Sequence, residues 1–171
     1  PANFQLVAAM NPCPCGHFPD RSRCRCTDGQ ITRYLQKVSG PMLDRIDICV
    51  EAAPITYGDI KSSGNNESSR EIRARVEQAR KIQRERFAGE NVRCNGEMSG
   101  RHIRKFCGLG REEEKFMEEI FEKLALSARM HDRILKVART TADLAEEEKI
   151  RLADLCEAVS YVKSRDKFWG N

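Results

Sequence analysis

The sequence predicts a mainly helical protein in which the remnant of an α/β core precedes a helical bundle. The remnant is expected to hold two short strands, one or two helices and a cysteine-rich loop. Two observations support this division: apolar runs suited to strands occur only before residue 54, and apolar positions after residue 67 recur with helical spacing. The 171 residues are enough for one mid-sized domain or two small ones.

Two stretches have the pattern of β-strands. Residues 4–10 form a nearly unbroken apolar run before Asn-Pro, typical of a strand buried on both faces. Residues 46–51 alternate apolar and polar side chains. Because two short strands do not make a stable sheet in water, we expect their partners to lie outside this chain. The first residue, Pro1, favours the same expectation of a segment taken from a longer protein.

Helical patterns occupy most of the remaining chain. Apolar spacing predicts a helix over residues 28–38 with Thr27 or Asp28 as its N-cap, and then a short turn from Gly40 through Leu43. Residues 54–67 are rich in Pro, Gly, Ser and Asn, which indicates a linker. Beyond it we expect a bundle of about four or five helices. Their expected N-terminal signals are the capping-box spacing of Ser68 and Glu71, the caps Ser99 and Ser127, and the acidic run 112–114.

Composition excludes some classes of protein. Lys and Arg number 30 against 26 Asp and Glu, so bulk charge does not by itself indicate a nucleic-acid binder. No apolar run is long enough to span a bilayer, and we expect a soluble, cytoplasmic protein without membrane contact. The eight cysteines are expected to be reduced. Four of them are predicted to be small buried hydrophobes: Cys49, Cys94, Cys107 and Cys156.

The other four cysteines suggest a metal site. Cys13 and Cys15 are followed by Cys24 and Cys26, and four thiolates are enough for a closed tetrahedral zinc site. His17 is an alternative ligand, and a loop of reduced cysteines without metal is the other interpretation. Three arginines inside this loop, Arg21, Arg23 and Arg25, make a positive tip that suits phosphates or is only a solvated surface.

A phosphate-binding loop of the form GxxxxGK[ST] does not occur in the sequence. This chain alone is therefore not expected to bind ATP in the P-loop manner or to hydrolyse it.

Three runs carry a resemblance to a known family: LVAAMNPCPCG, SGPMLDRIDI and LSARMHDRILKVARTTADLA. Together with the cysteine pairs, they resemble the C-terminal part of the magnesium-chelatase-like AAA+ ATPases of the ComM/YifB type, from Phe4 to about Val162. The resemblance implies that the P-loop and the acidic Mg²⁺-binding strand lie upstream. It divides the chain into the end of the AAA+ core with its cysteine loop (1–53), a linker (54–66), a helical lid domain (67–165) and a tail (166–171).

The resemblance also implies roles for single residues. Asn11 matches sensor 1, which helps to orient the attacking water; Arg45 matches the arginine finger that reaches a neighbouring subunit; Arg129 matches sensor 2 of the lid. Taken by themselves, Asn11 is also a turn former, Arg45 a partner for a neighbouring aspartate, and Arg129 a charge at a helix start. Thr141 departs from the family pattern, which usually has an apolar residue there.

The resemblance implies that the full-length protein is an ATP-driven DNA helicase or branch-migration motor. It is expected to assemble as a ring, with a hexamer expected, and to use ATP and Mg²⁺. The alternative is a non-enzymatic, zinc-stabilised module that binds nucleic acid or protein. That alternative keeps the cysteines and arginines of the loop but makes the other three residues structural.

Overall fold

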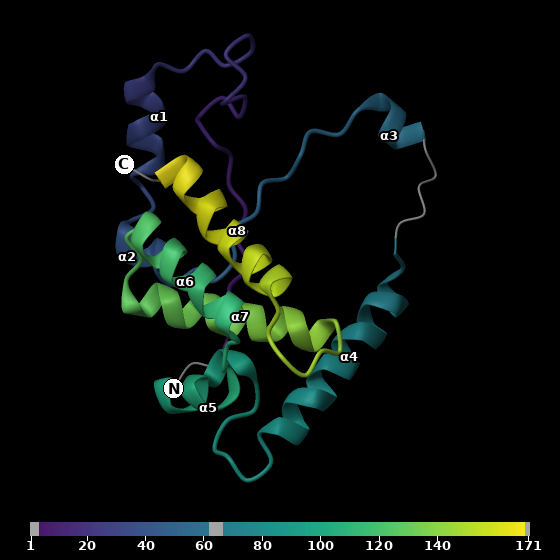
Figure 1. Cartoon of the computed structure of the whole chain (residues 1–171). Coiled ribbons are helices and arrows are strands. Elements are labelled where there is room, and N and C mark those ends of the chain that lie inside the picture. Colours follow the sequence, from purple (N-terminus) through teal and green to yellow (C-terminus); the bar gives the residue numbers. More distant parts are fainter. Residues whose placement is uncertain (1–3, 62–66, 170–171) are drawn as a thin grey trace. The chain divides into compact units, whose positions relative to one another are not determined.

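The computed structural model describes residues 4–61 and 67–169, and every regular element in these ranges is a helix (Figure 1). The chain divides into two compact units. The first contains residues up to Ile46 together with residues from Ser164 onward, and the second runs from Asp47 to Lys163. Along the described residues, no helix is both long and apolar enough to cross a membrane.

The first unit is built around α1 (Asp28–Leu35). The Thr27 side chain accepts a hydrogen bond from the Gln30 N–H, and the Gln30 side chain accepts one from the Thr27 N–H at 2.9 Å. This capping box confirms Thr27 as the N-cap. Ile31 and Leu35 are buried beside Cys13 in a small core of their own.

Two further contacts complete this unit. The indole N–H of Trp169 donates to the Leu35 carbonyl at 3.1 Å, which satisfies an acceptor at the C-terminal end of α1. The predicted turn after Gly40 is confirmed as α2 (Gly40–Leu43). Leu43 is the buried residue of that short helix.

The prediction of two strands is wrong for the described chain. Residues 4–10 and 46–51 contain no helix or strand in the structure. Their apolar side chains are largely exposed, with Phe4 at 76%, Val7 at 84% and Val50 at 73% of full exposure. The physical reason is that a strand is stabilised by hydrogen bonds to a neighbouring strand, and the described residues supply none.

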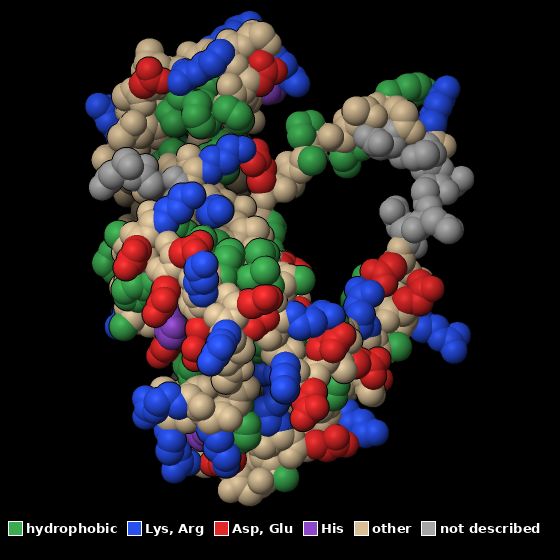
Figure 2. Space-filling view, viewed as in Figure 1, with side chains coloured by type: hydrophobic (Ala, Val, Ile, Leu, Met, Phe, Trp, Pro, Cys, Tyr) green, Lys and Arg blue, Asp and Glu red, His purple; other side chains and the backbone are tan. Residues whose placement is uncertain are grey.

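The second unit holds the longer helices. A capping box between Ser68 and Glu71 begins α4 (Ser69–Arg86), as predicted. The apolar positions of α4 are buried in its second half and exposed in its first half. Ala79 and Gln83 are buried where the helix packs against α7, whereas Val76 and Ile72, about one and two turns before Ala79, are exposed. Acidic and basic side chains are interspersed along the solvent side of α4 (Figure 2). The preceding segment includes a short helix, α3 (Tyr57–Lys61), and residues 62–66 of the predicted linker lie outside the described residues.

The predicted helical bundle is confirmed. Its remaining members are the 3₁₀ turn η1 (Asn95–Glu97) and the helices α5 (Gly100–Phe106), α6 (Arg111–Lys123), α7 (Ala128–Leu144) and α8 (Leu152–Trp169). Ser127 caps α7 by accepting a hydrogen bond from the Met130 N–H, as predicted. Helix α7 packs against α4, η1 and α5, and Ile134, Ala138 and Leu155 lie at the centre of the core.

The scattered cysteines only partly follow the prediction. Cys107 is buried, Cys49 and Cys94 are half-buried, and Cys156 is exposed. The prediction is therefore wrong for Cys156. The buried residues of α8 are Leu155, Ala158, Val159 and Val162, and Cys156 lies one position beyond that stripe, about 100° around the helix.

Candidate functional site

Four thiols converge in the cysteine loop of the first unit. The Sγ atom of Cys13 lies 3.4 Å from that of Cys15 and 3.8 Å from that of Cys24, and the Cys15 and Cys24 sulfurs are 3.6 Å apart. All four sulfurs, including that of Cys26, lie within 4.8 Å of one another. Zn–S bonds of about 2.3 Å would place tetrahedral sulfurs about 3.8 Å apart, so the spacing suits a four-thiolate metal site.

Tight backbone turns bring the first pair together. The Gly16 N–H donates to the Cys13 carbonyl at 3.0 Å, and Gly16 has a positive φ of 82° that L side chains rarely adopt. The turn directs the Phe18 N–H at the Cys13 sulfur, 3.4 Å away. Backbone N–H groups aimed at sulfur stabilise thiolates and orient them toward a metal.

The second pair is held by a turn of its own. The Cys24 N–H donates to the Asp20 carbonyl at 2.8 Å, and the Asp20 carboxylate accepts from the Ser22 N–H at 3.0 Å and the Ser22 hydroxyl at 2.6 Å. Each pair has one intervening residue rather than the more common two to four. This short spacing does not prevent a four-ligand site, because the two turns bring the sulfur atoms of both pairs together.

The thiols differ in acidity. A hydrogen bond from the His17 backbone N–H lowers the pKa of Cys15 to about 6, so this thiol is ionised at neutral pH. Burial raises the pKa of Cys26 to about 11. Full ligation of a divalent cation therefore requires protons to leave the less acidic thiols, which a bound cation favours by its charge. Soft thiolates in a tetrahedral set favour zinc among the common cations.

The geometry selects among the metal ligands predicted for this loop. Among the described residues, the group of potential metal ligands consists of the four cysteines, and His17 is not a member. The four-cysteine set is therefore the arrangement that could hold a metal.

The residues matched to sensor 1 and the arginine finger lie in the first unit. Asn11 is exposed, and its amide lies next to the tight turn, since a Cβ added at Gly16 would be 3.6 Å from the Asn11 Nδ2. Arg45 is also exposed, just beyond α2, and its guanidinium donates to the Pro41 carbonyl at 2.6 Å. The neighbouring aspartates pair elsewhere: Asp44 with Arg165 at 3.4 Å, and Asp47 with Arg133 at 2.9 Å.

The residue matched to sensor 2 lies in the second unit. Arg129 is exposed in the first turn of α7 and lines a hollow of about 590 Å³. Arg133 and Lys136 of the same helix also line it, facing Tyr161 of α8. Sequence reasoning did not select Arg133 or Lys136. The available signal was their spacing of four and seven residues from Arg129, which places all three on one face of a helix.

The run ARTTADL, which contributed to the resemblance, has a structural role in this unit. Asp143 is fully buried and accepts hydrogen bonds from Arg86, Arg139 and Asn95. The Asn95 amide also donates to the Thr140 hydroxyl at 3.0 Å. Three residues of the run therefore join α4, η1 and α7 through a buried polar network. Thr141, where the family pattern differs, donates its hydroxyl to the Val137 carbonyl within the same helix at 3.2 Å.

Comparison with known proteins gives two family matches. The model described as magnesium chelatase, subunit ChlI C-terminal, matches residues 66–162, and the model described as magnesium chelatase, subunit ChlI, matches residues 1–60. The chain is 42% identical over 162 residues to competence protein ComM of Haemophilus influenzae. It is 43% identical over 162 residues to protein YifB of Escherichia coli and 41% identical over 163 residues to YifB of Salmonella typhimurium.

Each of these alignments covers 94% of the chain but 31% of the relative. The chain thus spans about a third of the length of the curated relatives it matches. Because the C-terminal model alone accounts for more than half of its residues, the chain belongs to the magnesium chelatase ChlI family and is of the ComM/YifB type.

Proposed function

We propose that this chain is the C-terminal portion of a cytoplasmic AAA+ ATPase that assembles as a ring, expected to be a hexamer, and uses ATP hydrolysis to move or unwind DNA. In this proposal residues 1–53 end the ATPase core and residues 67–165 form its helical lid. Family membership supports the proposal, and one relative is named a competence protein. ATP and Mg²⁺ would be held mainly by residues upstream of those in this chain.

One observation carries the proposal for the site. Asn11, Arg45 and Arg129 are all exposed, and none has a carboxylate partner within the described residues. Other arginines near them behave differently. Arg133 and Arg139 of α7 pair with Asp47 and Asp143 respectively. An exposed arginine without a carboxylate partner keeps its charge available for a phosphate, as a finger or sensor requires.

Each residue has a distinct part in the proposed reaction. Asn11 orients the attacking water beside the nucleotide of its own subunit, and Arg129 contacts the same nucleotide from the lid. Arg45 reaches the neighbouring subunit's nucleotide and stabilises negative charge on the transferred phosphoryl group in the transition state. The donation from Arg45 to the Pro41 carbonyl at the end of α2 gives the guanidinium a defined starting position.

The arginine finger can be tested by mixing subunits of the full-length protein. Arg45→Ala should abolish most ATP hydrolysis while leaving nucleotide binding intact, and Arg33→Ala, an exposed arginine on α1, serves as the matched control. Because the finger acts across an interface, mixed rings of Arg45→Ala subunits with subunits mutated in the P-loop lysine should recover part of the activity. Normal turnover by Arg45→Ala, or no recovery in mixed rings, would show that Arg45 is not the finger.

We assign a structural role to the metal centre within this machine. The cysteine loop packs on a small core whose buried residues, within the described chain, are Cys13, Ile31 and Leu35, and a bound zinc ion would add cross-links that so small a core lacks. The alternative of a non-enzymatic, zinc-stabilised binding module keeps this centre. A full-length protein that retains zinc and binds DNA but hydrolyses no ATP would favour that alternative.

A further inference from the structure

The arginines of the cysteine loop are not equivalent. Arg21 forms an ion pair with Asp28 at the start of α1, and its guanidinium lies 5.1 Å from the centroid of the Phe18 ring. Its charge is therefore neutralised within the loop. The positive tip expected from the sequence is reduced to Arg23 and Arg25.

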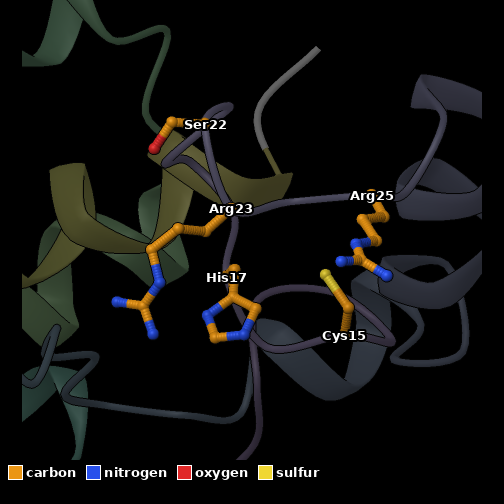
Figure 3. Close-up of a pocket in the computed structure, with 5 residues that line it drawn as sticks. All are labelled: Cys15, His17, Ser22, Arg23 and Arg25. Atoms are coloured by element: carbon orange, nitrogen blue, oxygen red, sulfur yellow. The ribbon is translucent and has the colours of Figure 1, made fainter.

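Arg23 and Arg25 line one hollow. Its cavity volume is about 490 Å³, and the other lining residues are Cys15, His17 and Ser22. In Figure 3 the two guanidinium groups flank His17 and Cys15. Both arginines are exposed, and within the described residues neither has a carboxylate within ion-pair distance. The nearest influence is electrostatic: Arg23 is one of the charges that lower the pKa of Asp20, after the hydrogen bonds from Ser22.

Two guanidinium groups that have no carboxylate partner among the described residues, placed around an open hollow, suit a phosphate group. The Asp20 carboxylate accepts hydrogen bonds from the Ser22 hydroxyl and N–H, and it forms no ion pair with the arginines of the hollow. The aromatic ring of the loop is also engaged. Phe18 is covered by Arg21 and meets Phe168 with 6.5 Å between ring centroids, so it is not available for stacking on a base.

We propose that this hollow, defined by His17, Ser22, Arg23 and Arg25, binds the phosphate backbone of DNA, with the metal-organised turns fixing the positions of the two arginines. The inference rests on the proposed function, in which DNA is the substrate, and it assigns DNA contact to a loop for which the ATPase reaction gives no role. Because the Phe18 ring is already engaged by Arg21 and Phe168, we expect the contact to depend on backbone charge and to be independent of base sequence.

Salt dependence distinguishes this contact from a general loss of folding. Each phosphate contact that an arginine makes contributes about 1 to the slope of log affinity against log salt concentration. Anisotropy of a fluorescein-labelled duplex, titrated with this chain between about 50 and 200 mM salt, measures that slope. The double variant Arg23→Ala, Arg25→Ala should lower it by about 2. The double variant with lysines at both positions should keep most of it, because lysine retains the charge.

The control is Arg33→Ala, which removes one exposed positive charge from α1 of the same unit. Its slope should match that of the unchanged chain, and bound zinc is measured for every variant. A second duplex of different sequence should bind equally well.

Each contrary result has a distinct meaning. If the double alanine variant and Arg33→Ala bind DNA alike, the hollow is not the contact, while DNA remains the partner of the proposed function. If the double variant loses zinc but keeps its salt slope, the arginines only balance the charge of the metal-bound thiolates and the inference is overturned. If the unchanged chain and the full-length protein both fail to bind DNA, this inference and the DNA part of the proposed function fail together, and the ATPase part is judged by the Arg45 experiment.

Discussion

Arg86 near the end of α4 and Asp143 near the end of α7 form a two-pronged ion pair, with Nη1 of the arginine 2.7 Å from Oδ2 of the aspartate. The two residues are 57 positions apart in the chain. Asp143 is fully buried, and Arg139 on its own helix donates to it as well. Arg139 also donates to the carbonyls of Glu147 and Glu148, so the loop after α7 is tied to the same carboxylate.

Removing this carboxylate should be strongly destabilising. In Asp143→Ala, two arginines lose their buried counter-charge, and we expect the free energy of unfolding to fall by about 3–5 kcal/mol. Urea denaturation followed by circular dichroism measures this change. Asp132→Ala, on the exposed side of α7, is the matched control and should change stability by no more than about 0.5 kcal/mol. Equal stability of the two variants would contradict a central role for the network.

Glu90 should make stability depend on pH in the acid range. Its carboxylate accepts from Lys105 at 2.6 Å and Arg101 at 3.0 Å, with His102 3.5 Å away, and the Lys105 hydrogen bond comes first among the causes that lower its pKa from 4.5. The unfolded chain therefore binds a proton at this group more readily than the folded chain does. Its contribution is present above about pH 4.5 and is lost as pH falls through the lower folded pKa.

Thermal unfolding between about pH 3 and 7 tests this expectation. Glu90→Gln should lower Tm at neutral pH and flatten the acid limb of the curve relative to the unchanged chain. Glu118→Gln, an exposed glutamate on α6, is the control. Parallel curves for Glu90→Gln and the unchanged chain would exclude the ion cluster as a source of pH dependence.

The metal centre should bind about one zinc ion per chain. Cys13→Ser removes the fully buried donor and should abolish stoichiometric zinc, measured by elemental analysis after growth without added metal. Cys156→Ser, an exposed cysteine of α8 outside the cluster, should leave zinc content unchanged. Because the less acidic thiols must lose protons on binding, zinc affinity should also fall as pH decreases. Freely titratable thiols with less than half an equivalent of zinc would count against the centre.

Gly16 and Gly29 provide a matched pair of alanine substitutions in the first unit. Gly16 has φ of +82°, so Gly16→Ala should cost about 1–2 kcal/mol and weaken zinc binding. The added methyl group itself meets only an ordinary contact at Asn11, so the cost lies in the backbone. Gly29 lies within α1 with nothing within 4 Å of an added Cβ, and Gly29→Ala should stabilise by about 0.5–1 kcal/mol. Thermal denaturation of the zinc-bound variants measures both effects. If the two substitutions shifted Tm in the same direction, this prediction would be wrong.

Local signals in the sequence predicted most of the helices, whereas α3 lies in a segment predicted to be a linker. Ser68 and Ser127 were predicted as caps and Thr27 as one of two candidates, and the structure confirms each of them. A cap acts on backbone groups two or three residues away, so its effect is contained in the local sequence. The strands failed for the opposite reason. An apolar run such as residues 4–10 becomes a strand only through hydrogen bonds to another segment, which the described residues do not provide.

The sequence by itself determined the helical content, the four-cysteine set and, through its resemblance to a family, the three residues proposed to act on ATP. Only the tertiary structure decided which charges are available. It pairs Arg21 with Asp28 and leaves Arg23 and Arg25 around one hollow. It also buries Asp143 among residues from three elements. Spacing along the chain cannot show these differences, because an ion pair or a metal site depends on distances between side chains that only folding brings together.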